Sequence, residues 1–153
     1  MKKKILFLLA CLFLIILSIP ACQKDDNTPA PITKTQLLTQ SSWTFEKATA
    51  GAFGDVSAQI PACYKDNVFT FVSNGTGNVN EGANVCVPST ARAFTWAFQN
   101  NETTLNISTT LFPGGSSTFT IVSLTETNLV ISQPVTLPPP ISSTVTVETT
   151  LKH

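Results

Sequence analysis

Two of the four cysteines bracket the stretch of the chain whose residue types and spacing most plainly suggest chemistry. Cys63 precedes a polar turn and an alternating strand at Val68–Ser73, and an Asn-Gly pair then favours a reversal into a second strand that leads towards Cys86. Such a hairpin brings the two thiols together, so we expect a disulfide across its open end. Zinc binding is the competing chemistry, but it needs about four ligands, and His153 is the only histidine.

Groups that could perform catalysis are scarce. A serine or cysteine nucleophile needs a positioned base, and His153, as the terminal residue, is expected to be mobile. The carboxylates fall in turns or near strand ends, where solvated groups are expected: Asp55, Asp66, Glu81, Glu102, Glu126 and Glu148. Asp66 is expected to cap the turn before its strand. The sequence therefore predicts no enzyme, no catalytic residue, no metal site and no cofactor.

The N-terminus has the pattern of a secretion signal. Lys2–Lys4 precede an apolar run at residues 5–19, which is short for a membrane-spanning helix of about 20 residues. A buried core helix is the alternative, but the run is not amphipathic. We expect residues 1–21 to be a signal peptide.

The end of this signal resembles a bacterial lipobox, in which the cysteine is lipidated and becomes the first mature residue. The four residues are Ile19-Pro20-Ala21-Cys22, where lipoboxes usually carry leucine first and a small residue second. An ordinary signal peptide with a free cysteine near the cut is the alternative. Because each buried methylene stabilises membrane binding by about 0.8 kcal/mol, several acyl chains on Cys22 would hold the protein to a bilayer. Residues 22–32 would be this lipidated cysteine and a proline-containing tether.

Charge and the residues after the anchor bear on location and partners. Lys24-Asp25-Asp26 looks like the surface-export signal of lipoproteins in the Bacteroidetes group, although charged residues also simply start solvated linkers. We expect an outer-membrane lipoprotein exposed on the cell surface.

The net charge of the mature chain bears on its partners. Removing Lys2–Lys4 from nine basic residues against nine acidic ones leaves a net charge of about −3, which argues against nucleic acid as a partner.

Residues 33–153 predict a single all-β domain after one short helix. Ile32–Gln40 is the helix candidate, with Thr35 as a possible cap. Apolar and polar residues then alternate over eight short segments, which lie near residues 43–47, 68–73, 76–81, 94–99, 105–107, 118–121, 129–131 and 143–151. The segment at 49–61 and the prolines at 138–140 separate some of them. Short turns favour pairing between consecutive strands, so we expect an antiparallel up-and-down β-barrel, with a two-sheet sandwich as the alternative.

Large aromatic residues recur on the apolar side of these strands and would converge inside a barrel. They are Trp43, Phe45, Phe69, Phe71, Phe94, Trp96, Phe98 and Phe119. An eight-stranded barrel is wide enough either to be filled by side chains or to hold one small ligand. The set therefore predicts either a filled core or the walls of an apolar pocket.

Several segments together resemble the lipocalin-like domain of many Bacteroidetes lipoproteins. The most specific are Cys63-Tyr64-Lys65-Asp66-Asn67 and the second cysteine, Cys86; Phe69-Thr70-Phe71, Asn74-Gly75-Thr76, Phe94-Thr95-Trp96, Thr104–Ile107 and Ser123–Ile131 follow the same order. The likeness covers about Leu37 to the C-terminus. It implies a small lipid-anchored β-barrel, but no firm biochemical role.

Two functions follow as expectations. The barrel binds a small hydrophobic or amphipathic ligand, or it is filled and serves as a structural or interaction module that binds a protein or glycan through its loops. No feature of the sequence predicts the ligand or an oligomeric state.

Overall fold

The computed structural model describes residues 30–136 and 143–153, and its folded unit spans Ile32–His153. Eight strands form the framework of this unit: β1 (Trp43–Thr49), β2 (Val68–Val72), β3 (Thr76–Asn80), β4 (Arg92–Gln99), β5 (Thr104–Ile107), β6 (Thr118–Leu124), β7 (Asn128–Thr136) and β8 (Thr144–Lys152). Two α-helices, α2 (Lys34–Thr39) and α3 (Ala62–Lys65), and two 3-10 turns, η1 (Gly51–Phe53) and η2 (Ser57–Gln59), complete it. The prolines at 138–140 lie outside the described residues.

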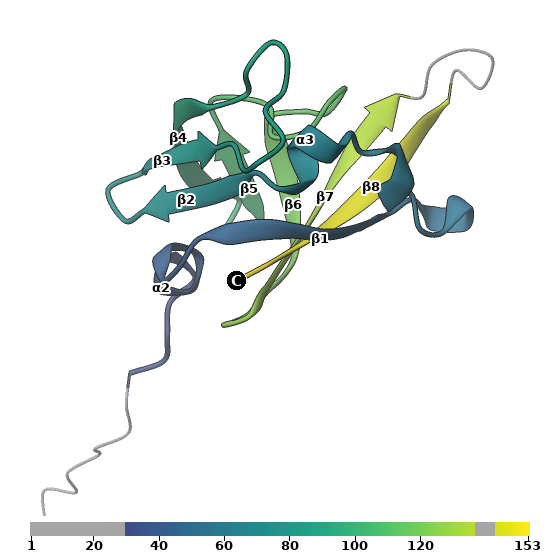
Figure 1. Ribbon diagram of the computed structural model, residues 1–153. Coiled ribbons are helices and arrows are strands. Elements are labelled where there is room, and N and C mark those ends of the chain that lie inside the picture. The colour runs from purple at the N-terminus through teal and green to yellow at the C-terminus, as the bar shows by residue number, and fades with distance from the viewer. Residues whose placement is uncertain (1–29, 137–142) are drawn as a thin grey trace, which may run out of the picture. The chain divides into compact units, whose positions relative to one another are not determined.

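The strands close into one barrel in which each pairs antiparallel with its sequence neighbour (Figure 1). Closure comes from β8, which pairs with β1 through contacts such as Phe45↔Leu151. The predicted up-and-down barrel is therefore confirmed, and the sandwich alternative is wrong. Full closure leaves no sheet edge unpaired around the ring, which is how this architecture avoids edge-to-edge association.

The inner face of the barrel holds the hydrophobic core. Burial alternates along β2, β3, β4, β5 and most of β7, so that in β4 the side chains of Phe94 and Trp96 are 4% and 8% exposed while their neighbours face solvent. The outward positions carry many threonine, serine and asparagine side chains, as the alternating pattern predicts. Gly77 of β3 leaves room for the ring of Phe94, because a Cβ there would collide with it.

Up-and-down topology places the connections alternately at two ends, which we name the closed end and the mouth. The closed end carries α2 and the short β2–β3, β4–β5 and β6–β7 turns; the C-terminus lies at this end as well (Figure 1). The mouth carries the longer β1–β2, β3–β4 and β5–β6 connections. The predicted loop at residues 49–61 is at the mouth and contains both 3-10 turns.

Helix α2 covers the closed end and is fixed at both termini. Its N-cap is Thr33 rather than the predicted Thr35: the Thr33 hydroxyl accepts from the Gln36 N–H, and the Gln36 side chain accepts from the Thr33 N–H. The Leu38 side chain is fully buried. None of the helices in the described residues is long and apolar enough to span a bilayer.

A disulfide fastens the mouth. Cys63 in α3 is bonded to Cys86 in the β3–β4 loop, with their Cα atoms 5.2 Å apart and the two residues 23 positions apart in sequence. The predicted pairing is confirmed. It ties the segment that enters β2 to the loop that leaves β3, so two of the mouth connections are covalently joined.

Candidate functional site

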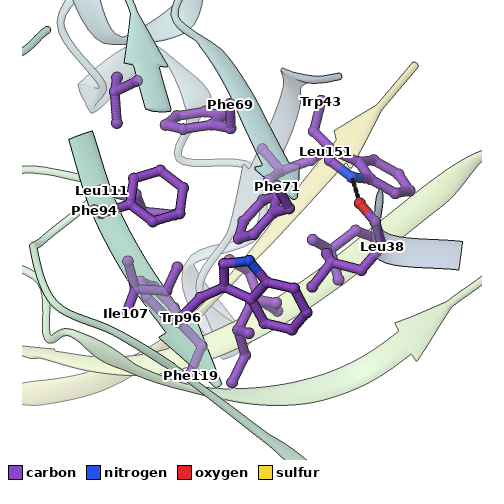
Figure 2. Packing of buried hydrophobic residues seen from close by; sticks show 14 of the residues in the cluster. Leu38, Trp43, Phe69, Phe71, Phe94, Trp96, Ile107, Leu111, Phe119 and Leu151 are labelled. Atoms are coloured by element: carbon purple, nitrogen blue, oxygen red, sulfur yellow. Dashed lines mark hydrogen bonds between the residues drawn. The ribbon is translucent and has the colours of Figure 1, made fainter. Parts of the chain in front are cut away.

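The eight aromatic residues proposed as pocket walls all belong to the interior of the barrel. Six are nearly or fully buried and two, Phe45 and Phe98, are partly buried against the same cluster. Figure 2 shows Trp43, Phe69, Phe71, Phe94, Trp96 and Phe119 gathered from different strands around a common centre.

These rings pack on one another more than they line a space. Phe71 meets Phe94 edge-on with centroids 5.3 Å apart, and Trp96 lies 5.9 Å from Phe71 and 5.4 Å from Phe98. The Trp96 indole N–H is satisfied by the carbonyl oxygens of Val72 and Thr76 at 3.1 and 2.9 Å. This part of the interior is a packed aromatic core, with edge-to-face geometry of the kind that favours ring pairs.

Trp43 connects helix α2 to the C-terminal residue His153 at the closed end. Its indole N–H donates to the Leu38 carbonyl at 2.9 Å, drawn as the dashed line in Figure 2. That carbonyl lies in the last turn of α2, where backbone acceptors have no partner within the helix. On its other side the indole contacts the His153 ring at 3.8 Å between centroids, and a His153 ring nitrogen lies 2.9 Å from the Ser42 carbonyl. The prediction that His153 is mobile is therefore wrong.

The mouth is filled by two side chains that the sequence analysis did not select. Leu111 and Phe112 in the β5–β6 loop are 2% and 4% exposed. The Phe112 ring lies 5.8 Å from Phe69 and 6.3 Å from Phe45. Because β5 and β6 stand across the ring from β1 and β2, this contact crosses the lumen. We name Leu111 and Phe112 the mouth plug.

A turn presents the plug inward. Gly115 N–H donates to the Phe112 carbonyl at 3.3 Å, with Pro113 and Gly114 between them. Gly114 has a φ of +66°, and proline followed by a left-handed glycine is the sequence of a type II turn. An apolar pair directly before Pro-Gly, in an otherwise polar loop, was the sequence signal that could have found the plug.

A polar network stiffens the neighbouring part of the rim. The Glu81 carboxylate accepts from the Ser89 hydroxyl at 2.6 Å, from the Thr90 N–H at 2.8 Å, and from the Cys86 N–H and the Thr90 hydroxyl at 3.0 Å each. These hydrogen bonds, led by the one from Ser89, lower the pKa of Glu81 to about 2. The carboxylate therefore stays ionised and holds the β3–β4 loop in one shape.

Asp66 joins the same rim but does not cap its own turn as predicted. One carboxylate oxygen accepts from the Asn84 backbone N–H at 2.8 Å and from the Asn84 side-chain amide at 2.9 Å. These bonds, the backbone one first, hold the pKa of Asp66 below its usual value. Asp66 thus connects the entry to β2 with the loop after β3, alongside the disulfide.

Asn67 is a fully buried amide directly before β2. Its side-chain N–H donates to the Thr90 hydroxyl at 3.1 Å, and no described residue donates to its side-chain oxygen. It is buried as Phe69 and Phe71 are, and it stands at the position that continues their alternation towards the mouth. An unpaired amide oxygen is therefore buried two residues before Phe69, whose ring contacts the plug residue Phe112.

Acid should weaken the rim through Glu81. Because its pKa in the folded protein lies below the ordinary 4.5, its hydrogen bonds stabilise the fold fully above about pH 4.5, and that stability is lost as the pH falls towards 2. Glu81→Gln should therefore lower the urea midpoint at pH 7 and approach the parent protein near pH 2. Glu126→Gln, which changes an exposed carboxylate in the β6–β7 turn, is the control. A difference between Glu81→Gln and the parent that stays constant from pH 7 to 2 would contradict this role.

The two best-formed hollows in the described part of the chain are shallow and lie mainly on the outer face. One, of about 420 Å³, is lined by Thr76, Gly77, Asn78, Ala93, Phe94, Thr95 and Ser108. The other, of about 320 Å³, is lined by Ser116, Thr118, Thr120, Ser132, Gln133, Pro134 and Thr146. Among the described residues, no group of three or more histidine, cysteine or carboxylate side chains is placed to hold a metal ion. The mouth therefore remains the site with buried apolar surface and with two buried side-chain oxygens that lack a partner among the described residues, one from Asn67 and one from Asp66.

Comparison with known proteins gives a family and distant structural likenesses. Residues 31–131 match the model of the lipocalin-like domain family. Bovine odorant-binding protein in complex with undecanal is 14% identical, with a TM-score of 0.44 over 80% of this chain and 74% of that one. A deswapped triple mutant of the same bovine protein is also 14% identical, with a TM-score of 0.40 over 74% and 72% of the two chains. No curated protein matches the chain. Because the family model covers well over half of the sequence, this chain belongs to the lipocalin-like domain family.

Proposed function

We propose that the protein is a lipid-anchored lipoprotein of the Bacteroidetes type that binds one small hydrophobic or amphipathic molecule in its barrel. The observation that carries the binding proposal is the mouth: in the described part of the chain, two side chains of the β5–β6 loop, Leu111 and Phe112, are buried there against the apolar interior. A lipocalin-like barrel fits such a ligand, because its wall is aromatic and aliphatic.

The chemistry of the interior supports an uncharged ligand. The buried core cluster contains only aliphatic and aromatic side chains, and the buried polar residues, among them Asn67 and Thr90, carry no charge. Bringing an ion into such a site without a partner would be costly. No catalytic constellation is proposed, and the protein is not proposed to be an enzyme.

A saturable probe titration tests the binding proposal. The full chain carrying Cys22→Ser, which removes the proposed lipid attachment, should enhance the fluorescence of the neutral dye N-phenyl-1-naphthylamine with one-to-one saturation. Native mass spectrometry of the membrane-extracted protein should show one retained small molecule. A linear, non-saturating dye response together with an empty protein would contradict binding.

The location is proposed from the N-terminal sequence. Residues 1–21 would be removed as a signal peptide, and the lipid on Cys22 with the tether at residues 22–32 would hold the barrel of residues 33–153 at the outer membrane. Lys24-Asp25-Asp26 would act as the export signal that places the barrel on the outer side. Cys22→Ser should abolish incorporation of an alkyne-tagged palmitate, whereas Cys11→Ser should leave it unchanged. Equal labelling of the two variants would rule out this anchor.

A second function is favoured by the tightness of the aromatic core. If the interior never opens, the loops at the mouth are the surface available to a protein or glycan partner. Phe53 in η1 is 57% exposed in that region. Under this alternative, Phe53→Ala would abolish partner capture while Phe112→Ala would not.

A further inference from the structure

The mouth of the barrel combines a removable apolar plug with a buried hydrogen-bond acceptor. From this juxtaposition we propose that the ligand is an amphipathic molecule with a hydroxyl group, whose apolar part replaces Leu111 and Phe112 and whose hydroxyl donates to the side-chain oxygen of Asn67. This inference rests on the proposed binding function and names its site and ligand class.

The first step is that the plug can leave. At the tip of the β5–β6 loop, within the described chain, the backbone hydrogen bond is internal to the turn, from Gly115 N–H to the Phe112 carbonyl at 3.3 Å. The nearest anchors to the wall come on either side of the tip: Arg92 donates to the Thr109 hydroxyl at 3.2 Å, and the Ser116 N–H donates to the Gln133 side chain at 2.7 Å. Apolar burial therefore holds the tip, and an apolar ligand can replace that burial.

The second step is that the opposite side of the mouth is fixed. There the Cys63–Cys86 disulfide and the hydrogen bonds from Asn84 to Asp66 hold the β3–β4 loop against the entry to β2, and the Glu81 carboxylate fixes the shape of the loop itself. The rim is thus rigid where Asn67 lies and is held by apolar contacts where the plug lies. A ligand that enters would move the β5–β6 loop and leave the acceptor in place.

The third step is the orientation of the Asn67 amide. The Thr90 hydroxyl donates its hydrogen to Glu81, so towards Asn67 it can only accept. Turning the amide over would set two acceptors against each other. The side-chain oxygen of Asn67 must therefore point away from Thr90, and no described residue donates to it. Because a buried acceptor without a partner destabilises the protein, a donor from a ligand would be favoured there.

Calorimetric titration of the full chain carrying Cys22→Ser tests the site with two matched probes. 1-Decanol has a hydroxyl donor, whereas its methyl ether does not. We expect 1-decanol to bind about five- to tenfold more tightly than the ether. Asn67→Leu should remove the preference, and Thr90→Val, which frees the amide to turn, should reduce it even if Asn67→Leu does not fold. An equal affinity for both probes in the parent protein would overturn the role of Asn67.

Truncating the plug tests the exchange. Phe112→Ala should bind both probes about tenfold more tightly than the parent, because the competing ring is gone and the open state no longer has to be populated. Phe53→Ala, which truncates the same kind of side chain in η1 where it is 57% exposed, should not. Equal affinities for the parent and Phe112→Ala would overturn the mouth site but leave the binding function standing. If neither the parent protein nor Phe112→Ala bound the probes, or if only Phe112→Ala bound them, the binding function itself would be overturned.

Discussion

Replacing Trp43 by alanine should lower the free energy of unfolding by about 3–5 kcal/mol, the range for truncating a large buried aromatic residue. The side chain is fully buried, its N–H satisfies the Leu38 carbonyl, and its ring packs on His153. Losing it would empty the closed end and release α2. Urea unfolding followed by circular dichroism measures the effect, which would be a large share of the 5–15 kcal/mol typical of a domain.

Phe53→Ala is the matched control, since it truncates an aromatic side chain that is 57% exposed. It should change stability by less than about 0.5 kcal/mol. Trp43→Phe separates packing from the hydrogen bond, and should cost about 1–3 kcal/mol because the Leu38 carbonyl is left unpaired. A Trp43→Ala loss no larger than that of Phe53→Ala would show that the closed end is not held in this way.

Removing the disulfide is expected to be the second large effect. Cys63→Ser with Cys86→Ser opens a link between residues 23 apart, which in the chain-entropy account stabilises by about 3 kcal/mol. The melting temperature should fall by roughly 10 °C. Differential scanning calorimetry under non-reducing conditions measures this shift.

Reduction supplies the internal control for the disulfide. A reducing agent should lower the melting temperature of the parent protein towards that of the double serine variant and leave the variant unchanged. A melting temperature of the double variant equal to that of the oxidised parent would mean that the hydrogen bonds of Glu81 and Asp66 hold the rim without the covalent link.

Much of the barrel could be predicted from the chain because its determinants are local. Alternation of apolar and polar residues in Phe94–Gln99, and turn residues such as Asn74 and Gly75, specify strands and reversals within a few positions. The run Asn100-Asn101-Glu102, a polar segment between β4 and β5, takes left-handed φ values of 51°, 53° and 59°. The aromatic residues were likewise placed inside because they share the apolar side of their strands.

The content of the mouth could not be predicted, because it depends on contacts between distant segments. Phe112 meets Phe45 and Phe69 across the barrel, and although the apolar pair before Pro-Gly hints at burial, nothing within the β5–β6 loop indicates which residues its tip contacts. Local sequence suggested that Asp66 caps its own turn, whereas the carboxylate bonds to a residue 18 positions later.

The prediction that His153 is mobile was wrong for the same reason. A terminal residue is usually mobile, and only the closed barrel brings its ring onto Trp43. The unpaired side-chain oxygen of Asn67 could not be predicted either, because it depends on the hydrogen bond that the Asn67 side-chain N–H donates to the distant Thr90 hydroxyl.

The most direct test of the ligand site is NMR of the full chain carrying Cys22→Ser, with labelled phenylalanine rings, asparagine side-chain amides and tryptophan indoles, during titration with 1-decanol. The account predicts that the signals of Phe112 and Asn67 shift with one common dissociation constant, while the indole signal of Trp43 at the closed end stays in place. Saturation with 1-decanol that moves Trp43 but leaves Phe112 and Asn67 unchanged would contradict it.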